Sequence, residues 1–227
     1  MNEVPKQRWG CLQWGIVIGV VLLLISLIIP TLNLIPEMGD QTRGVMNCRQ
    51  IIQALRQFSQ DNGSAYPDMR FPELSSSNQI FRKLYQEGVL VDESIFGCPK
   101  SVFLPDGKIG TEPQFEKALM PGECHWMPLK HQADASRGDV PLIIENSLIS
   151  SWPPKWDVSA PESIKRGRAW GGRLIIVGHN DGSVEVEKLG KNGTTRWHDQ
   201  RNGGKSWIDS LTPEQIAKLA YWDIEEK

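Results

Sequence analysis

The chain has 227 residues, enough for one hydrophobic core with appended segments. Lys plus Arg number 25 and Asp plus Glu number 27, which gives a net charge of −2. The chain therefore lacks the excess of basic residues that is typical of proteins that bind nucleic acid through charge, and nucleic acid is not an expected partner.

The first predicted element is a transmembrane helix over residues 14–36, preceded by a cytoplasmic segment over residues 1–13. The residues from Trp14 to Ile35 include no charged side chain. As a helix, that run would be about 33 Å long at roughly 1.5 Å per residue, enough to cross the hydrocarbon core of a bilayer. The apolar region of a signal peptide is usually about 7–15 residues, so a retained membrane helix is the better interpretation.

The charges beside the run predict its orientation. Lys6 and Arg8 precede it, and Glu37 and Asp40 follow it. The positive-inside bias therefore predicts a single-pass membrane protein with a cytoplasmic N-terminus and an exported C-terminal domain.

Residues 37–62 are predicted to continue the helix as an amphipathic segment. Its apolar residues recur at helical spacing and share one face; they are Val45, Cys48, Ile51, Ile52, Leu55 and Phe58. Asn62-Gly63 suits a left-handed helix end, and Pro67 follows it. Residues 63–227 are predicted to form the exported globular domain.

Further elements are predicted along this domain. Helices are expected over residues 77–90, with Ser77 as N-cap, over 111–123 and over 211–222. Thr212 and Gln215 form a capping box in the last of these, with Pro213 at the first helical position. Residues 140–146 are expected to form a buried strand. Residues 173–179 and 183–189 are expected to form a hairpin around Asn180, Asp181 and Gly182, with positive φ at Gly182 and at Asn180 or Asp181. The predicted fold is α+β: a long N-terminal helix packed on a small antiparallel sheet, with short helices and long loops.

The cysteines give a redox prediction. Cys11 lies at the cytoplasmic edge and is expected to stay reduced. Cys48 lies on the apolar face of the helix and is expected to be a buried thiol. Cys98 and Cys124 lie in turn-rich segments of an exported domain, where disulfides persist, and they are predicted to pair.

The sequence contains no strong catalytic or cofactor-binding pattern. His125 follows Cys124 directly, but adjacent residues of an extended segment point to opposite faces, which disfavours a Cys–His dyad. The acidic residues do not follow the spacing of a calcium loop. We therefore predict no enzyme activity, no cofactor and no metal site. Six tryptophans in the last third either anchor a loop-rich fold or contact a ligand such as a sugar.

The order of these features resembles the type IV pilin and type II secretion pseudopilin superfamily. The segment "NCRQIIQALRQFSQDNGSAYPD" resembles the end of the long helix in these proteins and the turn after it. "FGCP" and "DGSVEVEKL" resemble pilin-like proteins of Planctomycetes–Verrucomicrobia bacteria. The resemblance is good over residues 9–68 and patchy beyond them.

The N-terminus departs from the pattern of this superfamily. Aligning Pro30 with the conserved proline of the family places Trp9 at mature position one and Gln13 where the family has Glu, with Arg8 in place of the Gly before the cleavage site. A rival register, with cleavage after Gly10, puts Gly15 at that position and loses the proline match. Either way the acidic residue is missing. The resemblance therefore implies a subunit that prepilin peptidase does not cut.

The function implied by the resemblance is structural: a pseudopilin-like component of a type II secretion or type IV pilus-type machine. Its partners would be the membrane and other pilin-like subunits or secretion-machine components. It would lie in the inner membrane, with a cytoplasmic N-terminus and a periplasmic C-terminal domain. The residues expected to pack in the membrane are Gln13, Ile16, Val20, Leu24, Ile28 and Pro30. The alternative is an anchored extracytoplasmic binding module, in which the helix is only a tether and the Trp-rich C-terminal region meets a ligand.

Overall fold

The computed structural model describes residues 10–159, 164–195 and 206–227, without the side chains of residues 11–13 and 27–37. The chain divides into two compact units, residues 1–41 and residues 42–227. The second unit contains helices and a four-stranded antiparallel sheet, so the α+β class is confirmed for it.

Helix α1 (Cys11–Asp61) is one continuous helix of 51 residues. Its part within the second unit buries one face, as the helical spacing of the apolar residues predicted. Cys48, Ile51 and Ile52 are fully buried there, and Leu55 and Phe58 are 1 % exposed. The helix ends where predicted, with positive φ at Gly63.

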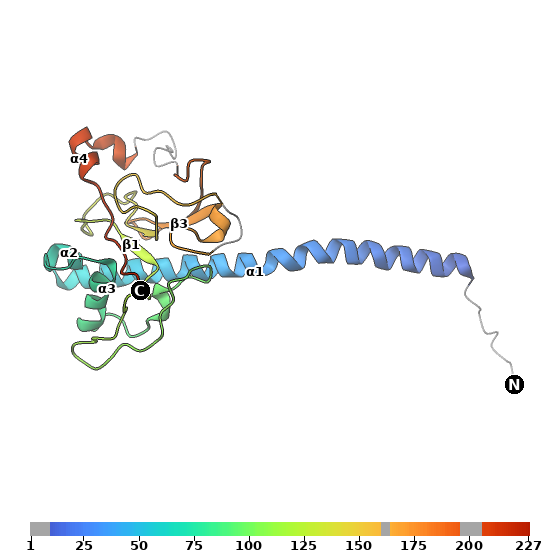
Figure 1. Cartoon of the computed structure of the whole chain (residues 1–227), viewed down its shortest axis with the longest axis horizontal. Coiled ribbons are helices and arrows are strands. Elements are labelled where there is room, and N and C mark those ends of the chain that lie inside the picture. Colours follow the sequence, from blue (N-terminus) through green and yellow to red (C-terminus); the bar gives the residue numbers. More distant parts are fainter. Residues whose placement is uncertain (1–9, 160–163, 196–205) are drawn as a thin grey trace. The chain divides into compact units, whose positions relative to one another are not determined.

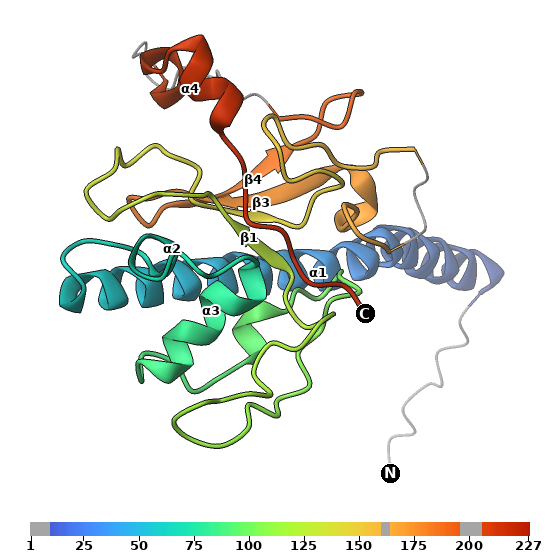
Figure 2. The same cartoon turned by 60° about the vertical axis from the view of Figure 1, so that its left-hand side comes forward.

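Two short helices follow α1 and pack close to it. Helix α2 (Pro67–Arg70) begins at Pro67, which occupies the first helical turn, where a missing N–H has no cost. Helix α3 (Ser77–Gln86) is capped by Ser76, one residue before the predicted cap, because the Ser76 side chain accepts from the Gln79 N–H. Figures 1 and 2 show α3 and the sheet on opposite sides of the C-terminal half of α1.

The sheet has the order β1–β2–β3–β4, and every neighbouring pair is antiparallel. The strands are β1 (Trp126–Pro128), β2 (Ile143–Glu145), β3 (Leu174–Gly178) and β4 (Val184–Lys188). The predicted buried strand and the hairpin are confirmed as β2 and as β3–β4. Strand β1 was not predicted. Strand β4 lies at one edge of the sheet, and its Val186 is 42 % exposed.

Glycines set the distance between α1 and the sheet. A Cβ atom on Gly178 of β3 would lie 2.6 Å from Cys48 Sγ and 2.5 Å from Ile52 Cδ1. A Cβ atom on Gly44 of α1 would lie 2.5 Å from Ile176 Cδ1. The helix therefore rests against the backbone of β3 at a separation that leaves no room for a methyl group at Gly178.

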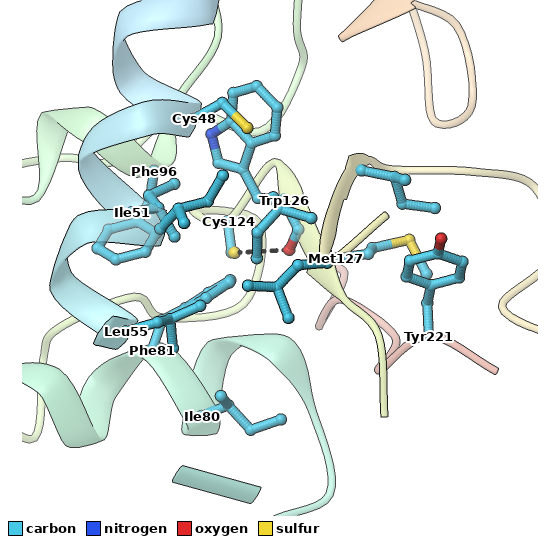
Figure 3. Packing of buried hydrophobic residues seen from close by; sticks show 14 of the residues in the cluster. Cys48, Ile51, Leu55, Ile80, Phe81, Phe96, Cys124, Trp126, Met127 and Tyr221 are labelled. Atoms are coloured by element: carbon cyan, nitrogen blue, oxygen red, sulfur yellow. Dashed lines mark hydrogen bonds between the residues drawn. The ribbon is translucent and has the colours of Figure 1, made fainter. Parts of the chain in front are cut away.

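The core cluster joins both sides of α1. Figure 3 shows Cys48, Ile51 and Leu55 of α1 among side chains from α3, β1 and the C-terminal segment. Ile80, Phe81, Leu84 and Tyr85 of α3 are all buried. Tyr221, from the end of the chain, is fully buried and donates to the Pro141 carbonyl.

The helix predicted over residues 111–123 is wrong, since these residues form turns. Tertiary hydrogen bonds replace the helical ones. The Leu119 N–H donates to the buried Glu93 carboxylate at 2.5 Å. The Ala118 carbonyl accepts from Arg82, and the Leu119 carbonyl accepts from Asn78. Phe115 and Leu119 have positive φ, which a helix does not allow.

The C-terminal helix is confirmed in a shorter form. Helix α4 (Pro213–Lys218) has the predicted capping box, with Thr212 accepting from the Gln215 N–H and Gln215 accepting from the Thr212 N–H. The chain then leaves the helix and returns along β1, where Tyr221 forms a bridge with Leu129.

Candidate functional site

Three features of the described residues bear on function: the apolar N-terminal part of α1, the β3–β4 turn and a polar cluster in the core. In the first, apolar side chains on all sides of the helix are exposed. Of the predicted packing residues, Ile16 is 60 %, Val20 53 % and Leu24 50 % exposed. Ile18 and Leu22, which point elsewhere, are 55 % and 60 % exposed. The structure therefore singles out no packing stripe among these residues, and α1 is apolar on every side over residues 14–25.

Three of the predicted packing residues, Gln13, Ile28 and Pro30, have side chains outside the described part. Arg8 and Trp9, on which the processing prediction depends, also lie outside the described residues. Among the residues that the structure describes, no helix meets the length and apolarity required to cross a membrane.

The β3–β4 turn has the predicted residues but a different conformation. The Gly182 N–H donates to the His179 carbonyl at 2.9 Å, and the His179 N–H donates to Ser183 at 2.8 Å. Gly182 has φ of +88°, as predicted, whereas neither Asn180 nor Asp181 has positive φ. The connection is a tight turn followed by one left-handed glycine, a common alternative to the predicted primed turn.

Asn180 is the buried anchor of this turn. Its side chain accepts from the Tyr66 hydroxyl at 2.7 Å and donates to the Ser136 carbonyl at 2.9 Å. Asp181 accepts from the Ser183 N–H at 2.8 Å. These contacts make the turn a structural junction between the hairpin, the segment that joins α1 to α2, and the loop before β2.

The predicted Cys98–Cys124 disulfide is wrong, because Cys48, Cys98 and Cys124 are all separate buried thiols. Cys124 donates to the Trp126 carbonyl at 3.3 Å within the core cluster (Figure 3). Cys98 belongs to the same core cluster, but its Sγ lies near Gly44 and His125. Cys124 and His125 are adjacent in an extended segment, so their side chains point to opposite faces. Because Cys98 Sγ lies beside the His125 ring, it is on the face away from the Cys124 side chain. Cys48 is a buried thiol, as predicted.

The polar cluster brings together Cys98, His125 and Glu145. One ligand-type atom from each residue lies within 4.8 Å of the other two. The three residues are 2 %, 0 % and 1 % exposed. His125 directly precedes β1, Glu145 ends β2, and Cys98 lies two residues after η1 (Ser94–Phe96).

Sequence reasoning missed this cluster because it considered only the neighbouring Cys124 as a partner for His125, and rejected it. The only local signal was a histidine and a glutamate beside two apolar segments. Their approach depends on the antiparallel pairing of β1 with β2, in which Trp126 lies opposite Glu145. Because β1 was not predicted, that pairing could not be predicted either.

Most tryptophans of the C-terminal region belong to the core. Trp156, Trp170 and Trp207 are 3 %, 2 % and 6 % exposed. The half-buried Trp152 contacts Trp207 edge to face, with ring centroids 5.3 Å apart. Trp222 is half-buried and donates to Asp68, and Trp197 lies outside the described residues. The described tryptophans therefore anchor the fold and do not form an exposed ligand platform.

No family model matches this chain, and neither a curated protein nor a solved structure matches it.

Proposed function

We propose that the chain is a membrane-anchored, pilin-like structural subunit of a type II secretion or type IV pilus-type machine. The observation that carries this proposal is that two parts of one continuous helix have different surfaces. Residues 14–25 of α1 are apolar on every side and exposed, whereas residues 48–58 bury one face in the domain core. A helix with these two kinds of surface suits a subunit that is held in lipid at one end and carries a folded domain at the other.

The membrane part of the proposal rests on the uncharged run from Trp14 to Ile35. An apolar helix surface in water is unfavourable by about 25 cal/mol for each Å² exposed, so the exposed side chains need a lipid or protein environment. The flanking charges favour a cytoplasmic N-terminus and, in the proposed machine, a periplasmic globular domain. The inner membrane is the compartment that satisfies both requirements.

A structural role also suits the chemistry of the domain. The thiols of Cys48, Cys98 and Cys124 and the His125 ring are all 2 % exposed or less, so a substrate could not reach them. We therefore propose no enzyme activity. The anchored binding module is the weaker alternative, because the described tryptophans of its supposed binding region are buried or half-buried in the fold.

We further propose that prepilin peptidase leaves the chain intact. Arg8 stands where the family has a small residue before the cleaved bond, and Gln13 stands where it has Glu. An uncut chain has no free amine at the bilayer to pair with a carboxylate, and a neutral amide is less costly to bury than an unpaired carboxylate. A subunit of this kind would sit at the end of an assembly or beside it. N-terminal sequencing of the membrane-extracted protein tests this: a chain that begins at Trp9 or Cys11, or that carries an N-methyl group, would contradict it.

Cysteine crosslinking in native membranes tests the proposed assembly. Single cysteines introduced along residues 16–28, in a chain with Cys11 replaced by Ser, should crosslink to a neighbouring subunit with helical periodicity. Adding Val20→Asn or Leu24→Asn should abolish the crosslinks, while the conservative Val20→Ile or Leu24→Ile should preserve them. If the helix is only a tether, the crosslinks should be absent or should show no periodicity.

A further inference from the structure

The cluster of Cys98, His125 and Glu145 contains two buried polar atoms without a hydrogen-bond partner. These atoms are His125 Nε2 and Glu145 Oε2. They lie 3.9 Å apart, which is too far for a direct hydrogen bond. A carboxylate oxygen buried in an apolar core without a partner is strongly unfavourable, so the arrangement indicates that something occupies the space between these atoms.

We propose that Cys98, His125 and Glu145 bind a divalent transition-metal ion, and that zinc is the best match. A thiolate, an imidazole nitrogen and a carboxylate oxygen form the mixed donor set that zinc accepts, whereas calcium and magnesium take oxygen ligands. The donor atoms are all within 4.8 Å of one another. Small side-chain movements would bring them to metal–ligand distances of about 2.0–2.3 Å.

Neighbouring groups already hold the two unpartnered atoms in position. The Trp170 indole N–H donates to Glu145 Oε1 at 2.7 Å, which leaves Oε2 directed to the cluster. Ser101 Oγ lies 2.7 Å from His125 Nδ1, which leaves Nε2 as the available ring nitrogen. Hydrogen bonds of this kind orient the ligands of metal sites.

The hydrogen bonds of Asn146 determine which nitrogen of the His125 ring carries the proton before an ion binds. Its Oδ1 accepts from the Gly167 N–H at 2.7 Å, so its Nδ2 faces His125 Nδ1 at 2.8 Å. In the ion-free chain Nδ1 therefore accepts from Asn146, and the ring proton is on Nε2. When an ion binds Nε2, the ring proton moves to Nδ1 and donates to Ser101 Oγ. The Cys98 thiol loses its proton to solvent as the sulfur–metal bond forms.

The inferred proton shift gives a specific variant. Asn146→Asp keeps an oxygen for the Gly167 N–H and places a second oxygen beside Nδ1. That carboxylate would accept from the Nδ1 proton and favour the metal-binding tautomer. Changes to groups that support a metal ligand typically alter affinity by about 10–100-fold, so Asn146→Asp should tighten metal binding by an amount on that scale. If the cluster holds only protons or water, the Asn146→Asp substitution should not change the affinity of the chain for metal.

Metal analysis of the full chain, purified in detergent without chelators, tests the proposal. The purified wild type, supplied with zinc, should hold one ion per chain, and Cys98→Ala should hold none. Cys124→Ala is the matched control, since Cys124 is an equally buried thiol that belongs to the core cluster and not to the polar cluster. It should keep the ion. Loss of the ion from Cys124→Ala with retention in Cys98→Ala would overturn the assignment.

A second measurement uses the wild type alone, in case Cys98→Ala fails to fold. The chain is unfolded, treated with chelator and refolded with cobalt alone or with no metal. The proposal predicts the near-ultraviolet charge-transfer band of a cobalt thiolate and a higher thermal midpoint for the cobalt-loaded chain. If the refolded wild type shows neither the band nor the shift, the cluster is not a metal site. This inference does not depend on the function proposed above.

Discussion

Gly178→Ala tests the closest contact between α1 and the sheet. The new Cβ would lie 2.6 Å from Cys48 Sγ and 2.5 Å from Ile52 Cδ1. Ile52 Cδ1 is the end of a flexible side chain and can rotate away, but the sulfur is attached directly to Cβ of a helical residue. The Cys48 contact should therefore account for most of the cost.

The size of the effect follows from two opposing terms. Overpacking a dense core costs about 1–3 kcal/mol, and replacing a strand glycine by alanine returns about 0.5–1 kcal/mol, so the midpoints of these ranges give a net loss of about 1 kcal/mol. In Cys48→Ala the sulfur is absent. The double variant should therefore lose less than the sum of the two single losses, with a coupling energy on the order of 1 kcal/mol.

Urea unfolding of the detergent-solubilised chain, followed by the fluorescence of its buried tryptophans, measures these values. Gly44→Ala is the control. Its Cβ would make one very close contact, with the flexible end of Ile176, and alanine favours the helix by about 1 kcal/mol. That variant should be near neutral. Equal stability of Gly178→Ala and wild type, or strictly additive losses in the double variant, would refute this account of the packing.

Three further predictions concern single sites in the domain. Gly182→Val should lower the free energy of unfolding by about 1–3 kcal/mol, because φ at this position is +88° and strains a residue with a side chain. A steric clash is not the cause, since the nearest atom to a Cβ there would be 3.7 Å away. An unchanged thermal midpoint would contradict this prediction. Glu93→Gln should cost about 1–3 kcal/mol, because Glu93 accepts from the N–H groups of both Gly107 and Leu119 and an amide can accept with only one end; urea unfolding checks it. Burial raises the pKa of the Cys124 thiol above its ordinary value of 9.0, so the unfolded thiol loses its proton first as the pH rises. The contribution of Cys124 to stability should therefore be complete below about pH 9 and fall above it, and Cys124→Ala should show a shallower alkaline decline in urea unfolding; equal slopes would argue against it.

Local signals predicted the elements that local physics determines. The apolar spacing from Cys48 to Phe58 marks the buried face of α1, because a helix repeats its faces every 3.6 residues. Thr212 and Gln215 predicted the start of α4 through bonds that lie within one turn. Gly182 predicted a left-handed position in the hairpin, which few other residues adopt.

Tertiary contacts decide the features that were missed. Residues 111–123 have a helical composition, but Glu93, Arg82 and Asn78 take hydrogen-bonding groups that a helix would use. Strand β1 has only three residues, all buried, so it shows no alternation of polar and apolar side chains. The polar cluster depends on β1, and its three residues, Cys98, His125 and Glu145, come from three separate segments of the chain. Its geometry therefore emerges only from the folded chain.

The most direct test of the central proposal is membrane topology in the cell. The full chain with a C-terminal tag should pellet with the inner membrane after alkaline carbonate washing. Protease added to intact cells should leave the tag, and protease added to spheroplasts should remove it. A chain recovered in the soluble fraction, or a tag that survives protease in spheroplasts but not after lysis, would contradict the proposal that α1 anchors a periplasmic domain.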